Sequence, residues 1–169
     1  HLRPRQDTEH RWSGTCTVIV DHAQDVCYKF RHAQVDCRDN LTTMISFKPK
    51  QITKELLSVL PERARDVLEK RYGLGPQGET QTLEAIGQSY GITRERVRQI
   101  ENHGISSIQK SDSYDEFEPV FSELQRVIEE LGGGLIAEHT LLEEITNDPI
   151  MRNHIYFLLM VGQPFYRAK

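Results

Sequence analysis

The sequence of 169 residues has no long apolar run. Its longest, residues 155–161, is far shorter than the ~20 residues that a membrane-spanning helix needs. No apolar signal-peptide core follows the N-terminus. There are three cysteines, and an odd number without a secretion signal argues against a disulfide framework. These absences predict a cytoplasmic protein with no membrane contact.

Sequence patterns typical of enzymes are also missing. The chain contains no G-x-S-x-G, HExxH or Walker pattern, and its glutamates follow the spacing of solvated helix faces. Ser106 and Ser107 have no acid–base partner nearby in the sequence. We therefore predict a protein that is not an enzyme and that has no catalytic residues and no cofactor.

The cysteines, Cys16, Cys27 and Cys37, all lie in residues 1–43. Together with two histidines, two of them form a series at five-residue steps: His22, Cys27, His32 and Cys37. A zinc site can use two cysteines and two histidines, but the usual clustered C-x(2–4)-C knuckle is absent. We predict that no metal is bound here.

Residues 1–43 show no sustained helical period and one short β-like run, residues 16–20. Helical patterning starts abruptly after Met44. We therefore expect residues 1–43 to be disordered or to be a leader foreign to the native protein. Two helical domains should follow, residues 44–110 and residues 117–169, joined by a polar, acidic linker at residues 111–116.

Residues 82–103 have the pattern of two short helices joined by a tight turn. Thr82 and Thr93 are placed to cap the two helices. Gly91, between them, can take the left-handed conformation that ends a helix. The pattern is typical of a helix-turn-helix.

The second helix of this pair has two chemically different faces. At about 100° per residue, Val97 and Ile100 point toward the first helix. The opposite arc carries side chains of the types that read base edges in a major groove: Arg94, Glu95, Arg98 and Gln99. A solvated charged face would also show alternating charges, but the two caps and the corner glycine favour DNA reading.

Two motifs then point to a family. LPERARDVLEKRYGL (60–74) and TLEAIGQSYGITRERVRQIENHGISSIQK (82–110) closely resemble region four of bacterial sigma factors of the sigma-seventy family. The resemblance extends over residues 51–110. It implies a four-helix domain that reads the −35 promoter element and docks on the flap of the RNA polymerase β subunit through an apolar surface.

The resemblance also implies a role for individual side chains. Arg94, Glu95 and Gln99 would meet base edges, and Arg98 would lie near phosphates and within reach of the groove. The remaining expected phosphate contacts are Thr82, Thr93 and Arg96.

Two features differ from the family's pattern. In primary sigma factors a basic segment follows this helix, whereas residues 103–110 here carry little positive charge, which argues against contact with activators. The sequence also shows no counterpart of region two, which recognises the −10 element and melts DNA. We therefore expect that this polypeptide does not start transcription as a lone sigma factor.

Residues 117–169 predict three helices followed by the beginning of a strand, with a glycine stop at residues 132–134. This order suggests a small, incomplete winged helix, faintly similar to acidic winged-helix domains of polymerase-associated proteins. Residues 111–169 hold 4 basic and 11 acidic side chains, whereas residues 44–110 hold 11 and 8. The basic part suits phosphate contact and the acidic part suits a protein partner.

The fold class expected for the chain is mainly all-α. We predict a sequence-specific DNA-binding transcription initiation factor or regulator, associated with the nucleoid, whose partners are double-stranded promoter DNA and RNA polymerase. Two alternatives stay open: an adaptor on RNA polymerase with a weak DNA face, and a C-terminal fragment of a complete sigma factor.

Overall fold

The computed structural model describes residues 27–30 and 45–168 of the chain. This part is mainly helical, as predicted. Four helices fall in the sigma-like segment: α1 (Pro49–Ser58), α2 (Glu62–Tyr72), α3 (Leu83–Tyr90) and α4 (Arg94–Gln109). Four more follow: α5 (Asp112–Glu116), α6 (Glu118–Gly132), α7 (Glu138–Ile145) and α8 (Pro149–Val161). None of the helices described here is long and apolar enough to cross a membrane.

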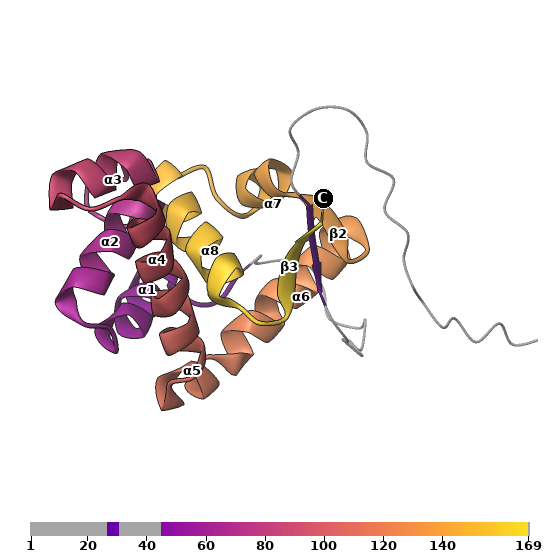
Figure 1. Ribbon diagram of the computed structural model, residues 1–169. Helices are drawn as coiled ribbons and strands as arrows, with labels where there is room; N and C mark the ends of the chain where they lie inside the picture. Colours follow the sequence, from indigo (N-terminus) through magenta and orange to yellow (C-terminus); the bar gives the residue numbers. More distant parts are fainter. Residues whose placement is uncertain (1–26, 31–44, 169) are drawn as a thin grey trace, which may run out of the picture.

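Helix α8 lies between the first four helices and a small sheet at the opposite end of the molecule (Figure 1). It packs against α1, α2 and α4. Tyr72 of α2 places its ring centroid 5.7 Å from that of Tyr156 and 5.3 Å from that of Phe157. One core therefore continues from the sigma-like helices into residues 111–169, which we call the C-terminal half.

Within the stretch predicted as a linker, residues 111–116, Asp112–Glu116 form the short helix α5. Its composition is polar, but Tyr114 is buried and stacks on Phe121 at 4.9 Å between ring centroids. The Tyr114 hydroxyl also accepts a hydrogen bond from the backbone N–H of Gln163 at 2.8 Å. One aromatic side chain therefore anchors this segment to the core.

Three strands form an antiparallel sheet of order β2-β1-β3: β1 (Cys27–Phe30), β2 (Leu135–Ala137) and β3 (Phe165–Ala168). Cys27 is paired with Ala137 on one side and with Ala168 on the other. Strand β1 lies in the segment expected to be disordered or a foreign leader, and it supplies the middle strand of this sheet. The β-like run at 16–20 and the other members of the Cys/His series lie outside the described residues.

Candidate nucleic-acid interface

Both helices of the helix-turn-helix begin at a threonine cap, as the sequence predicts. The Thr82 hydroxyl accepts a hydrogen bond from the backbone N–H of Ala85 at 3.1 Å. The Thr93 hydroxyl accepts one from the N–H of Arg96 at 3.2 Å. Each cap fixes the start of its helix and keeps a hydroxyl and unpaired N–H groups at an exposed, positive helix end.

The turn between α3 and α4 depends on two glycines. Gly91 ends α3 in the left-handed region, with φ of 63°. Gly87 lies so close to the start of α4 that a Cβ atom there would approach the carbonyl oxygen of Ile92 to 2.7 Å. Glycine at position 87 therefore allows the two helices to meet at the close distance that this turn requires.

The back of α4 is fixed by a small apolar cluster separate from the main core. Val97 is fully buried with Val67 of α2 and Ile86 of α3. Leu83, Tyr90, Ile92 and Ile100 pack around these three side chains. This contact sets the rotation of α4 about its axis, so its opposite face points to solvent.

All seven side chains predicted to meet DNA are exposed: Thr82, Thr93, Arg94, Glu95, Arg96, Arg98 and Gln99. Within this set, Arg98 makes a two-point contact with Glu95. Its Nε lies 2.9 Å from Oε2, and its Nη2 lies 2.7 Å from Oε1. The hydrogen bonds from Arg98 hold the pKa of Glu95 below its ordinary value, so this carboxylate stays charged.

The other side chains predicted to read bases also have partners within the protein. The Nη1 atom of Arg94 lies 2.9 Å from the Oε1 atom of Glu84 on α3. Arg96 donates from Nη1 to the Oε1 of Gln99 at 3.0 Å. Any ligand that binds this face must replace these contacts, and because the groups are exposed this replacement costs little. Glu84 was not anticipated, since only the crossing of α3 and α4 brings it to Arg94.

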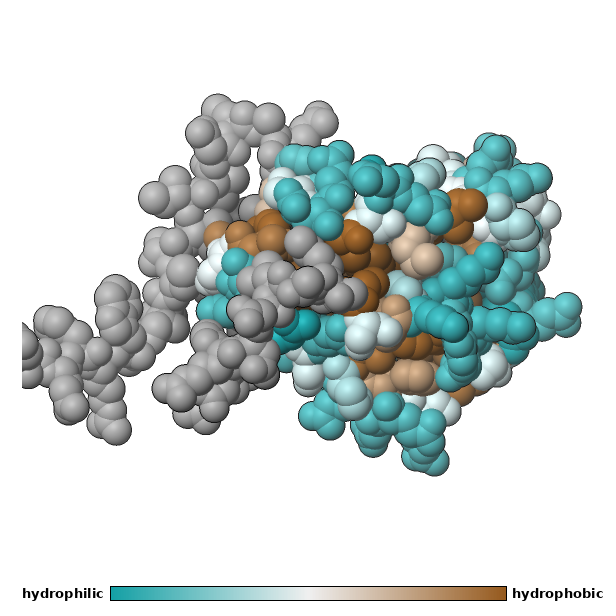
Figure 2. All heavy atoms as spheres, turned by 180° about the vertical axis from the view of Figure 1, so that it is seen from behind, coloured by the Kyte–Doolittle hydropathy of each residue, from teal (hydrophilic) through white to brown (hydrophobic). Residues whose placement is uncertain are grey.

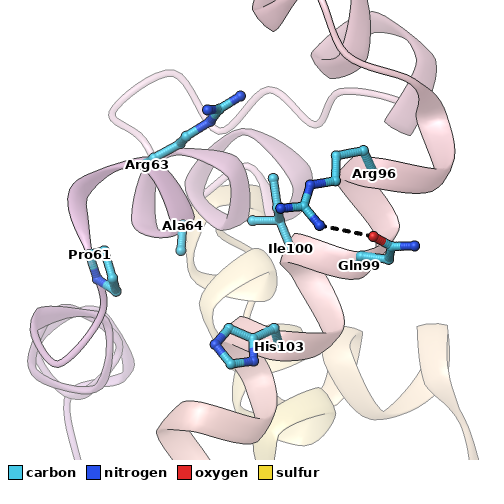
Figure 3. A pocket seen from close by; sticks show the side chains of 7 residues that line it. All are labelled: Pro61, Arg63, Ala64, Arg96, Gln99, Ile100 and His103. Atoms are coloured by element: carbon cyan, nitrogen blue, oxygen red, sulfur yellow. Dashed lines mark hydrogen bonds between the residues drawn. The ribbon is translucent and has the colours of Figure 1, made fainter.

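A hollow of ≈ 260 Å³ lies between parts of α2 and α4 beside this face (Figure 3). It is lined by Pro61, Arg63, Ala64, Arg96, Gln99, Ile100 and His103. Figure 3 shows the Arg96 guanidinium turned toward Gln99, with His103 further along the same helix. Arg63 of α2 also lies over the Tyr90 ring, with Cζ 5.5 Å from its centroid. Arg63 and His103 thus join the predicted site, although periodicity gave no signal for them.

No cluster of three metal-ligating side chains occurs in residues 27–30 or 45–168. What the described site offers is a convex helix face with guanidinium, carboxylate and amide groups side by side. Groups of these types can donate to and accept from base edges, and threonine caps and arginine side chains can meet phosphates.

Comparison with known proteins agrees with this geometry. Residues 56–110 match the family model for sigma-70, region 4. RNA polymerase sigma factor SigA of a Bacillus species is 42% identical over 60 residues, which are 36% of this chain and 16% of that protein. RNA polymerase sigma factor SigA1 of Synechococcus elongatus is 50% identical over 54 residues, 32% of this chain and 13% of that protein.

The predicted resemblance to sigma region four is thus confirmed, with the matched segment beginning at residue 56. The region is a helix-turn-helix DNA-binding domain without enzymatic activity. The chain spans less than a fifth of the length of the two relatives. Their similarity therefore concerns this domain alone.

Proposed function

We propose that this protein is a sequence-specific DNA-binding transcription factor that reads a −35-like promoter element and contacts RNA polymerase. The observation that carries the proposal is the exposed arc on α4, formed by Arg94, Glu95, Arg98 and Gln99. The arc lies on a helix whose opposite face is buried, within a segment that matches sigma region four.

In this proposal α4 enters the major groove with its N-terminal turns. Arg94 and Arg98 donate to guanine O6 and N7, and Gln99 pairs with the edge of an adenine. Glu95 accepts from a cytosine amino group. Recognition proceeds by exchange, because Arg98 leaves Glu95 and Arg94 leaves Glu84 as each meets a base.

The phosphates on either side of the groove are held by Thr82, Thr93 and Arg96. The threonines stand at the positive ends of α3 and α4, where free N–H groups favour an anion. Arg63 of α2 lines the same hollow as Arg96 of α4 and adds positive charge beside the recognition helix. These contacts orient the protein without reading sequence.

Contact with the polymerase β flap, through an apolar surface of this domain, requires that this surface be accessible. Tyr72 and Leu68 of α2 are buried in the core that α8 completes. Polymerase can reach the apolar side of α2 only if α8 moves away. We propose that polymerase binding and the packing of α8 on α2 compete, and that the acidic C-terminal half holds a protein partner of its own.

The experiment that tests DNA reading is a titration of labelled duplexes with the full chain. One duplex carries a TTGACA-like sequence and the other a scrambled version, both at several salt concentrations. We expect tighter binding to the first and a fall in both affinities with salt. Equal affinity for the two duplexes would refute base reading.

In the adaptor alternative the protein binds polymerase but its DNA face is weak. Capture of the polymerase β subunit by the full chain separates the two cases. Binding of β together with equal affinity for the two duplexes identifies an adaptor. Preference for the promoter duplex identifies the proposed factor.

A further inference from the structure

A second concave surface lies away from the DNA face, where the start of α1 meets the end of α7 and the first turns of α8. It has a volume of ≈ 590 Å³. Its lining consists of Ile45, Phe47, Lys48, Pro49, Lys50, Gln51, Lys54, Ile145, Thr146 and Met151. We call it the lysine-rimmed groove. It shares no residue with the hollow beside the recognition helix.

The floor of the lysine-rimmed groove is apolar and only half-buried. Ile45 and Phe47 come from the segment before α1, and Ile145 and Met151 come from α7 and α8. All four pack against the main core and keep part of their surface exposed. Figure 2 shows apolar side chains reaching the surface between hydrophilic ones on the face seen from behind. Apolar surface gathered in a concavity is typical of a binding site.

The rim carries charge of one sign. Lys48, Lys50 and Lys54 are exposed, and no ion pair joins them to any residue in the described part of the chain. No aspartate or glutamate lines the groove. This is notable because the C-terminal half that forms one wall is strongly acidic overall. The groove therefore presents positive charge around apolar surface.

The groove is formed by firmly packed elements. Helices α1 and α8 pack against each other, and Leu56 of α1 and Ile155 of α8 are fully buried. The Ser46 hydroxyl donates a hydrogen bond to Glu123 of α6 at 2.9 Å, which ties the segment before α1 to the C-terminal half. A site that is already shaped loses little conformational freedom when a partner binds.

We propose that the lysine-rimmed groove binds an acidic amphipathic segment of a partner protein, with apolar side chains on the floor and carboxylates beside the lysines. Charge complementarity selects the partner, since three unpaired ammonium groups attract carboxylates from solution. The apolar floor favours a protein over a nucleic acid. The phosphate backbone of a nucleic acid has no apolar groups to bury on this floor. Phe47 is the one aromatic side chain of the groove lining that could stack on a base.

The test uses the full chain and a labelled synthetic peptide that forms an amphipathic helix, with leucines on one face and glutamates on the other. Fluorescence anisotropy should show saturable binding that weakens as salt is raised. A peptide of the same apolar face with lysines in place of glutamates should bind at least ten-fold more weakly. Equal binding of the two peptides would overturn the proposal.

Variants then place the peptide in the groove. Met151→Glu should reduce the affinity for the peptide more than ten-fold. Met151→Gln is a milder change at the same position, and circular dichroism checks that both variants keep the fold. Lys50→Glu and Lys54→Glu should each weaken binding by about two- to five-fold, the effect of an exposed ion pair. Lys110→Glu is the control, since Lys110 is exposed elsewhere.

The same variants separate this inference from the proposed DNA function. Met151→Gln and Lys54→Glu should leave affinity for the promoter duplex unchanged, because neither residue lies on the recognition helix. Loss of DNA affinity with unchanged peptide affinity would assign the lysines to nucleic acid and would overturn the proposal. Unchanged peptide affinity in every groove variant would also overturn it.

Discussion

Asn153 on α8 donates a hydrogen bond to the carbonyl oxygen of Gly73, 80 positions earlier in the chain, at 3.1 Å. The same Nδ2 group donates to the carbonyl oxygen of Gly78 at 2.8 Å. One amide therefore holds the start and the middle of the loop between α2 and α3. This contact couples the helix-turn-helix to the C-terminal half through the loop that precedes it.

Replacing Asn153 with alanine should destabilise the protein by about 1–3 kcal/mol, because two partly buried carbonyl groups lose their donor. The measurement is the free energy of unfolding in urea. Asn102→Ala is the control, since Asn102 is exposed on α4. Equal loss in the two variants would show that the Asn153 contact contributes nothing specific.

Gly87→Ala should disrupt the helix-turn-helix. The added methyl group would lie 2.7 Å from the carbonyl oxygen of Ile92, and backbone must move to relieve the clash. Overpacking of this kind costs about 1–3 kcal/mol. Thermal unfolding measures the loss, and duplex titration measures the accompanying fall in DNA affinity.

The matched control is Gly75→Ala, because a Cβ atom at Gly75 meets nothing within 4 Å. This variant should keep the stability and DNA affinity of the parent. A Gly87→Ala protein that behaved like Gly75→Ala would contradict the close approach of α3 and α4.

Much of the candidate DNA face could be predicted because its determinants are local. A threonine cap, the left-handed Gly91 and the period that buries Val97 all act within one or two helical turns. These features fix which side chains of α4 face outward. Sequence alone therefore identified the exposed arc and its orientation.

The parts that were not predicted depend on contacts distant in the sequence. Glu84 meets Arg94 only because α3 crosses α4, and Arg63 lines the same hollow as Arg96 only because α2 packs against α4. Tyr114 is one aromatic residue in an acidic segment, so composition concealed its burial. Strand β1 lies more than 100 residues from the strands that it joins, and no local pattern reports such pairing.

Gln99→Ala should reduce affinity for the TTGACA-like duplex by about 1–3 kcal/mol and relax preference at one base pair. The amide would lose its bidentate contact with a base, while phosphate contacts would remain. Titration of duplexes substituted one base pair at a time measures the effect. An equal loss on every duplex would place Gln99 outside base reading.

Arg96→Ala should have the opposite signature. Loss of a phosphate contact weakens the TTGACA-like and scrambled duplexes equally and lowers the slope of log affinity against log salt by about 1. Arg126→Ala is the control, because Arg126 lies on α6 and pairs with Glu130 at 3.0 Å. A change in sequence preference in Arg96→Ala would instead assign Arg96 to base reading.

His154 should make stability depend on pH. Its side chain is buried on α8, and neither ring nitrogen has a hydrogen-bond partner among the described residues. Burial lowers the pKa of His154, and the positive charge of Lys50 adds to this effect, while Asp148 opposes it. The unfolded chain therefore binds a proton at higher pH than the folded protein.

From this sign, the free energy of unfolding should fall as pH drops below about 6.5, the ordinary value for histidine, toward the lower pKa of the folded state. Above that range His154 is neutral in both states and contributes no slope. His154→Phe should flatten the dependence between pH 7 and pH 5, whatever its effect on stability at pH 7. Urea unfolding at half-unit intervals measures the slope, with His103→Gln as the exposed control. If His154→Phe kept the full slope of the parent, the acid sensitivity would have to come from other groups, and the buried imidazole would play no part in it.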